Sequence, residues 1–340
     1  MDPALERLVL DSSCQVTTGS GIHVNPANGS KQCTPDNAAF AKLIAQYGFA
    51  IAPTAMHSAR TTGYGGFELA IEAAYTGIDS GADYWKKGTQ GPKDPVSNKF
   101  SDHNDSPSSM LQAYSLKIRK GFPFGLEITG DVGYLAQTSL VFGGADVRLS
   151  LFEGFRTGIP AIFPEVAVGG SIRSVAGTPE FQLTVAGFDA IISKPLPIAG
   201  SVVFTPYVGY QWIRIFGDSG LIDFTPNTDA VNYCGYTGIN TPANRDPTKK
   251  VSDGQPVCSY GSSADFNNQA VFDPVRLTRH RIVFGGQLRF QVLRFGIHSD
   301  IDLVSPESAN KGSDEEINGV NKFSGVKSQY TLAFDLGAIF

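Results

Sequence analysis

The sequence has no apolar run approaching the roughly 20 residues that a membrane-spanning helix needs, which excludes a helical membrane protein. Only 17% of its 340 residues are charged while 41% are hydrophobic, a balance that does not suit a disordered chain. It also lacks a basic tract, and its net charge is −5, so nothing indicates a nucleic-acid partner. No cofactor or metal motif is evident, and we expect neither.

A signal peptide is also missing, because the chain opens Met-Asp-Pro-Ala-Leu without a basic or an apolar region. Two explanations compete: a cytosolic protein, or the mature form of an exported one with an added start Met. The four cysteines have no C-x-x-C spacing and lie in polar, loop-like sequence. Of three possible connectivities, Cys14–Cys33 and Cys234–Cys258 are the most economical, and disulfides would indicate an oxidising compartment. The alternative is four free surface thiols.

Long segments in which apolar and polar residues alternate dominate the chain from about residue 66. This period of two is typical of β-strands. The segments are long enough for the nine to eleven or so residues that a strand needs to cross a bilayer. The segments with this pattern are Gly66–Ile78, Leu111–Lys120, Gly125–Ala136, Phe142–Phe152, Ile162–Arg173, Phe181–Ile191, Val202–Ile215, Arg281–Gln291, Arg294–Leu303 and Gln329–Phe340. Aromatic residues stand near the ends of their apolar faces, as in an interfacial girdle: Tyr75, Tyr134, Trp212, Phe295 and Tyr330.

The connections between these segments alternate between short and long. The short ones are Gly121–Gly125, Arg156–Pro160, Lys194–Gly200 and Val292–Leu293. The long, polar ones are Asp79–Ser109, Gly217–Val275 and Ser305–Val326. One edge of tight turns and one of long loops is the arrangement of a transmembrane β-barrel. We therefore predict an all-β, antiparallel barrel of ten strands, or of twelve if Phe49–Arg60 is a strand and another is unrecognised.

The end of the chain carries a second signal. Apolar residues occupy every second position before a terminal Phe340, namely Tyr330, Leu332, Phe334, Leu336 and Ala338. This pattern resembles the C-terminal signature of bacterial outer-membrane β-barrel proteins. The resemblance implies an outer-membrane location, contact with outer-membrane lipid, and recognition of the last strand by the barrel-assembly machinery.

The first sixty or so residues have a different, helical pattern. Thr34 can cap a helix with Pro35 in its first position, and Phe40, Leu43, Ile44 and Tyr47 follow at helical spacing, with Gly48 as the expected end. We predict two parts, an N-terminal helical extension over 1–62 and a barrel over 63–340. The extension is either a plug in the lumen or a periplasmic cap or appendage. The apolar face of the helix favours the plug.

Polar residues that alternate with the apolar set should face the lumen. The predicted lumen-lining residues are Glu68, Glu72, Lys117, Arg119, Glu127, Asp131, Asp146, Arg148, Glu165, Arg173, Arg281, Arg289, Arg294, His298, Asp300, Asp302 and Asp335. Their charges nearly balance, and a barrel of this size is little wider than its own side chains. Such charges should pair across the lumen, either as a structural network or as a selectivity lining.

These features lead to three hypotheses for function. The first is a narrow, plugged channel or transporter for a small solute or lipid. The second is a structural or interaction barrel that docks another envelope protein through its loops or its N-terminal extension. The third, an enzyme, rests on His298, Asp300 and Asp302, which share one strand face as in an omptin-like protease; matching acidic pairs are absent elsewhere.

Overall fold

The structure is a computed structural model. It describes residues 1–10, 16–18, 21–23, 33–54, 57–92, 104–152, 163–224, 234–236, 256–258, 269–317 and 319–340. Within these residues, no helix is both long enough and apolar enough to cross a bilayer.

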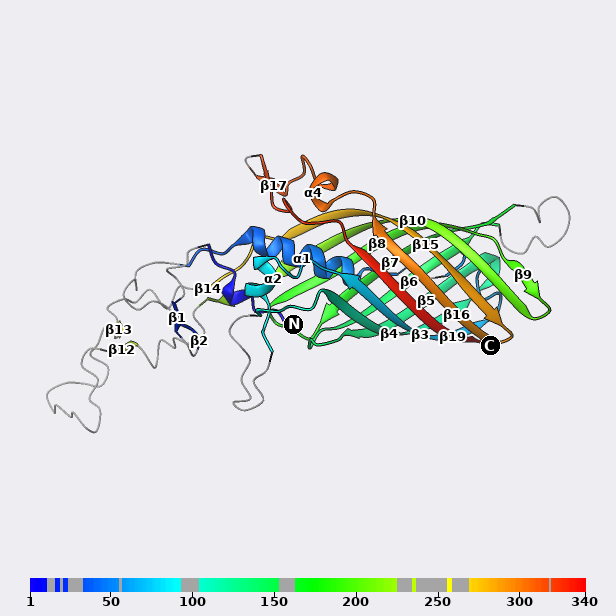
Figure 1. The fold of residues 1–340 in the computed structure, drawn as a ribbon, viewed down its shortest axis with the longest axis horizontal. Helices are drawn as coiled ribbons and strands as arrows, with labels where there is room; N and C mark the ends of the chain where they lie inside the picture. Colours follow the sequence, from blue (N-terminus) through cyan, green and yellow to red (C-terminus); the bar gives the residue numbers. More distant parts are fainter. Residues whose placement is uncertain are drawn as a thin grey trace, which may run out of the picture.

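Ten antiparallel strands form one closed barrel (Figure 1). In order around the barrel they are β3 (Phe67–Gly77), β4 (Met110–Gly121), β5 (Leu126–Leu135), β6 (Val141–Ser150), β7 (Glu165–Ala176), β8 (Phe181–Ser193), β10 (Val202–Ser219), β15 (Val275–Phe290), β16 (Leu293–Asp302) and β19 (Tyr330–Ile339). The last strand pairs with the first, with Leu336 opposite Ile71. The prediction of ten strands is confirmed. The twelve-strand alternative is wrong, because the described residues of 49–60 are a helix end and irregular chain.

The barrel has two different edges. At the short-turn rim lie the connections β4–β5, β6–β7, β8–β10 and β15–β16, the third of which holds the extra strand β9 (Leu196–Ala199). At the long-loop rim lie the other connections. They contain α2 (Asp83–Gly88), β11 (Ile222–Asp223), β12 (Cys234–Tyr236), β13 (Pro256–Cys258), β14 (Gln269–Ala270), α4 (Pro306–Ala309), β17 (Glu316–Ile317) and β18 (Val320–Asn321).

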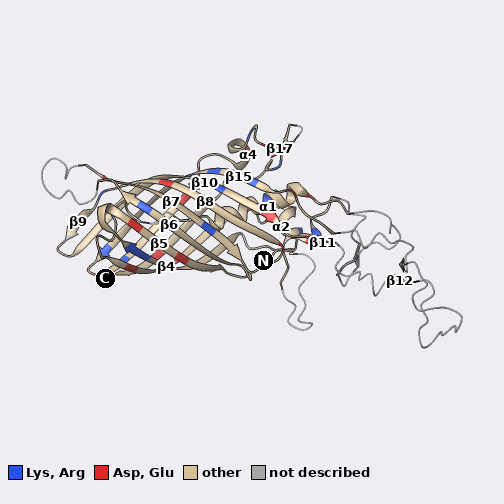
Figure 2. Ribbon diagram, turned by 180° about the vertical axis from the view of Figure 1, so that it is seen from behind, with Lys and Arg blue, Asp and Glu red and all other residues tan. Residues whose placement is uncertain are grey.

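Buried and exposed side chains alternate along each barrel strand. On β3, Ile71 is 59% exposed while its neighbour Glu72 is 5% exposed. The same alternation runs along the other strands, so apolar side chains cover the outside and most of the charged strand residues are buried. Figure 2 shows these acidic and basic positions spread over the barrel strands. A lipid environment explains this inverted pattern, because hydrocarbon solvates the apolar exterior and offers nothing to a charge.

Helix α1 (Asn37–Ile51) lies inside the barrel, where it contacts β3, β4, β8, β10 and β15. Its N-cap is Asp36, whose carboxylate accepts a hydrogen bond from the Ala39 amide at 2.9 Å. The predicted cap at Thr34 is therefore wrong by two residues. The predicted end at Gly48 is also wrong. This glycine allows close packing instead, since a Cβ there would lie 2.5 Å from Ile215 Cγ2.

The chain after α1, the descending chain (described residues 52–54 and 57–66), crosses the lumen from the long-loop rim to the short-turn rim. The contacts of α1 and of this chain descend along β10: Gly48 packs on Ile215, and the Pro53 carbonyl accepts a hydrogen bond from Gln211 at 3.0 Å. Lower still, the Ala59 amide donates to Ser193 Oγ, and Ser193 lies opposite Tyr207 of β10. The predicted boundary after residue 62 falls four residues before β3 begins.

Three further short elements lie before α1. They are η1 (Leu5–Arg7) and the paired strands β1 (Val16–Thr18) and β2 (Gly21–His23). Residues 1–10 lie at the long-loop rim, where the Ala4 amide donates to the Gly88 carbonyl at 2.9 Å. The first and last residues of the chain are thus at opposite ends of the barrel (Figure 1).

Candidate functional site

The lumen is the candidate site, and it consists of two layers. The apolar layer, toward the long-loop rim, surrounds α1. Apart from β16, every barrel strand contributes a buried apolar side chain to it: Ala74, Leu111, Ala113, Leu135, Phe142, Val175, Leu183, Val185, Ile213, Ile215, Val275, Leu277 and Ala333. From the helix come Phe40, Leu43, Ile44, Tyr47 and Ile51. Buried side chains from nine of the ten barrel strands thus join those of α1 in one apolar cluster.

The charged layer, toward the short-turn rim, is a network of ion pairs. At its centre Glu68 accepts from two bases, with Arg119 Nη1 at 2.8 Å and Arg294 Nε at 2.6 Å. Arg294 also reaches Asp335 at 2.5 Å. The other pairs between strands are Lys117–Glu72 at 2.6 Å, Arg119–Glu127 at 3.3 Å, Arg148–Asp189 at 3.1 Å, Arg173–Asp131 at 2.6 Å and Arg281–Asp300 at 3.8 Å. One further pair, Arg279–Asp302, lies beside α1 and nearer the long-loop rim, where Arg279 also donates to the Ala45 carbonyl at 2.9 Å.

Polar contacts hold the descending chain inside this layer. Thr54 donates to Glu72 at 2.9 Å and accepts from Lys117 at 2.8 Å. The His57 ring lies 2.6 Å from Arg148 Nη1 and 3.2 Å from a Glu127 oxygen. Contacts of this kind exchange with water at small net cost, unlike the apolar packing around α1.

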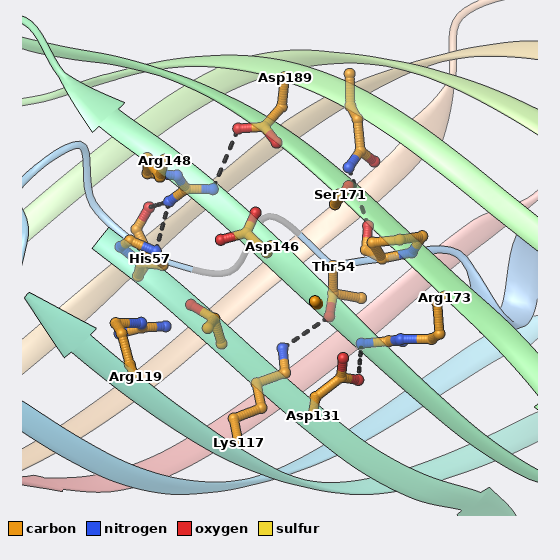
Figure 3. Close-up of a pocket in the computed structure, with 14 residues that line it drawn as sticks. Thr54, His57, Lys117, Arg119, Asp131, Asp146, Arg148, Ser171, Arg173 and Asp189 are labelled. Carbon is orange, nitrogen blue, oxygen red and sulfur yellow. Dashed lines mark hydrogen bonds and ion pairs between the residues drawn. The ribbon is translucent and has the colours of Figure 1, made fainter. Parts of the chain in front are cut away.

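A small cavity lies between the descending chain and the strands β4 to β8 (Figure 3). Its free volume is about 20 Å³, which is room for about one water molecule. Asp146 faces this cavity among Lys117, Arg119, Arg148 and Arg173. Those four bases have carboxylate partners on other strands, so Asp146 is balanced by their combined field rather than by one of them.

A second group of polar atoms lies buried on the opposite wall. Both ring nitrogens of His298 and both carboxylate oxygens of Asp300 lack a hydrogen-bond partner, as does the Tyr207 hydroxyl. His298 Nε2 and Asp300 Oδ2 are 4.0 Å apart, and the two side chains are fully buried. An omptin-like site would have to lie open at a rim, and this pair does not. The described residues contain no cluster of His, Cys, Asp or Glu arranged to bind a metal ion.

The structure places the predicted lumen residues on the inner face, with different depths. Fourteen of the seventeen are buried, and Asp131 and Asp146 are partly exposed toward the cavity. Arg289 differs, because it is exposed at the short-turn rim and donates to the carbonyl of Gln291. It lies beyond the last ion pair of β15, where water solvates it.

Sequence analysis missed four important members of the network: His57, Asp189, Gln211 and Arg279. Arg279 has the parity of Arg281, but the predicted strand began too late to include it. Asp189 and Gln211 share the inner face with apolar residues that pack on α1, which concealed the pattern. His57 lies in irregular chain, so no periodicity could have identified it.

The predicted assembly-signal residues lie along β19. Tyr330, Leu332, Phe334 and Leu336 share its outward face, and Phe340 is 73% exposed. Phe340 exchanges two backbone hydrogen bonds with Phe67, at 2.7 and 3.1 Å. The terminal residue therefore completes the β19–β3 seam that closes the barrel.

The predicted disulfides stay predictions. Cys14 lies outside the described residues, and Cys33 is buried beside α1. Cys234 and Cys258 lie opposite one another in the register of β12 and β13, which agrees with the pairing expected from the sequence.

No protein-family model matches this chain, and no curated protein matches its sequence. Among solved structures, it is similar to the attachment invasion locus protein Ail of Yersinia pestis, with 10% identity over 82% of this chain and 99% of that one, and a TM-score of 0.23. It is also similar to the outer membrane protein OprG of Pseudomonas aeruginosa, with 9% identity over 82% and 99% of the two chains, and a TM-score of 0.27. The chain is a closed, ten-stranded barrel of the outer-membrane type, a conclusion that its own strand pairings and inverted side-chain pattern carry.

Proposed function

We propose that this protein is a closed barrel of the Gram-negative outer membrane that acts through its long-loop rim, where it binds another component of the envelope. The apolar layer is the observation that carries this proposal. Burial of each large side chain of α1 stabilises by about 1.5–3 kcal/mol, and Phe40, Leu43, Ile44, Tyr47 and Phe49 are each at most 1% exposed. Withdrawal of the helix would therefore cost on the order of 10 kcal/mol, which makes it a permanent part of the barrel.

The distribution of the chain supports the same proposal. Apart from residues 37–66, most of the chain outside the barrel strands belongs to the long-loop rim, where α2, α4 and several short strand pairs lie. Long external loops are where barrels contact other molecules.

Planar bilayers provide the first test. The full chain should show no steady conductance, because buried apolar side chains surround α1 within the lumen. Steady steps from the full chain would contradict the closed-barrel proposal.

Photo-crosslinking in cells provides the second test. A crosslinking residue in place of Val320, which is 67% exposed on β18, should give a discrete adduct. The same residue in place of Phe124, which is 96% exposed at the short-turn rim, is the matched control and should not give that adduct. Equal adducts at both positions, or none at either, would remove the long-loop rim as the site of action.

A narrow channel is the second candidate, and the charged layer favours it. The contacts of Thr54 and His57 are polar and exchangeable, and the cavity beside them has a free volume of about 20 Å³. A channel opened by movement of this chain would conduct a small polar solute. Removal of residues 1–62 should then produce steady conductance that the full chain shows only when gated.

A further inference from the structure

The direction in which the N-terminal chain crosses the lumen has a topological consequence. In a barrel with an even number of strands, the first strand begins at the same rim at which the last strand ends. Here Phe67 and Phe340 are hydrogen-bonded neighbours at the short-turn rim. Residues 1–10 are nevertheless at the other rim, so the chain between them spans the whole barrel.

The contacts of residues 1–10 with the long-loop rim come from three separate connections. The Met1 amine donates to the Gln137 carbonyl, Asp2 accepts from Ser139, and the Leu5 amide donates to Glu180 at 2.8 Å. Pro3 forms a bridge with Thr89.

Residues that precede α1 return to the same rim. The Leu10 amide donates to the Thr34 carbonyl at 2.9 Å, and Val9 bridges Pro35. The start of α1 is fixed there as well, because the Asp273 amide donates to Asn37 Oδ1 at 2.9 Å.

Leu10 and Thr34 therefore lie together at the long-loop rim. In outer-membrane barrels, short turns face the periplasm and long loops face outward. We propose that the barrel carries its own N-terminal segment, of which residues 1–10 and 33–36 are placed at this rim, to the outer face of the membrane, with α1 and the descending chain as the part that remains in the lumen.

Two kinds of contact hold the N-terminal chain in the lumen. The outer part is held by apolar burial around α1, and the inner part by ion pairs and hydrogen bonds. This proposal rests on the path of the chain and does not depend on the proposed interaction function.

Single cysteines test it in intact cells that export the full chain behind a cleavable leader, labelled with a membrane-impermeant maleimide. Leu10→Cys reports the N-terminal segment, since Leu10 is 66% exposed. Tyr64→Cys is the matched control, since Tyr64 is 84% exposed where the chain emerges at the short-turn rim. Val320→Cys reports the orientation of the barrel, and the unmodified chain gives the background from its native cysteines.

Leu10→Cys and Val320→Cys should be labelled to the same extent before and after the outer membrane is permeabilised, while Tyr64→Cys should be labelled only afterwards. Labelling of Val320→Cys but not Leu10→Cys in intact cells would overturn the proposal, because the N-terminal segment would then lie inside. Labelling of Tyr64→Cys alone would overturn it too, by showing the reverse orientation. A closed barrel without conductance is compatible with each of these results, so the two proposals can fail separately.

Discussion

Asp335 on β19 lies directly opposite Gly296 on β16, and the carboxylate occupies the space that a side chain at position 296 would fill. The same relationship joins Asp131 to Gly144 and Asp189 to Gly169. In each pair a glycine on one strand leaves room for an inward-facing acid on the next. This is how a narrow barrel holds so many charged side chains.

Replacement of Gly296 by alanine should therefore destabilise the barrel. A Cβ there would collide with the Asp335 carboxylate and displace it from Arg294, and overpacking of this kind costs typically about 1–3 kcal/mol. Gly130→Ala is the matched control, because no atom lies within 4 Å of a Cβ at that position. Urea unfolding in detergent measures both. Equal midpoints for the two variants would contradict the packing argument.

Loss of Arg294 should be among the most damaging single changes. Arg294→Met would leave Glu68 with one partner and Asp335 with none, and an uncompensated buried charge costs about 3–5 kcal/mol. Arg289→Met removes the same type of side chain from an exposed position, and a surface change of this kind stays within about 0.5 kcal/mol. Thermal unfolding of the two variants compares them directly, and similar losses would show that the network does not stabilise the fold.

Attachment of residues 1–10 to the rim should weaken as pH rises. Burial raises the pKa of Glu180 to about 7, although the hydrogen bond from Leu5 opposes the shift. A carboxyl whose folded-state pKa is raised stabilises below its usual range, and that contribution is lost as pH rises toward 7. Hydrogen exchange at the Leu5 amide should therefore be slower, relative to its intrinsic rate, at pH 5.5 than at pH 8.

Glu180→Gln should abolish this pH dependence and keep the segment attached at both pH values. Glu307→Gln, at an exposed position on α4 of the same rim, should leave the dependence unchanged. An unchanged pH profile in Glu180→Gln would remove Glu180 as its origin.

The cysteine pairs should be oxidised in exported protein. Peptide mapping without reduction should recover one linked species containing Cys234 and Cys258 and another containing Cys14 and Cys33. Reduction should lower stability, since a disulfide that closes a loop of this length contributes roughly 3 kcal/mol. Alkylation of the cysteines in the folded, unreduced protein would contradict the pairing.

The barrel itself could be predicted from the sequence, because each of its ten strands has a pattern that a single segment displays. Alternation of Ile71 with Glu72, or of Ile118 with Arg119, indicates which side chains face lipid, and each short stretch of sequence contains this information. The tight turns and long loops are equally local. The residues of the inner face could be predicted from the same alternation wherever they are charged.

The path of the N-terminal chain and the partners within the lumen depended on the tertiary structure. Helical spacing predicted α1, but an apolar helix can be buried in several places. Its position became clear only from the inward-facing side chains Leu183, Ile215 and Leu277, which are buried in the same cluster. Arg294 pairs with Glu68 across two strand boundaries and 226 positions of sequence, a distance over which no local pattern carries information. The sequence by itself determined a barrel with charges inside it. Closure of the barrel around its own N-terminal segment decided which charges meet, because register and depth are properties of the closed barrel and not of any one strand.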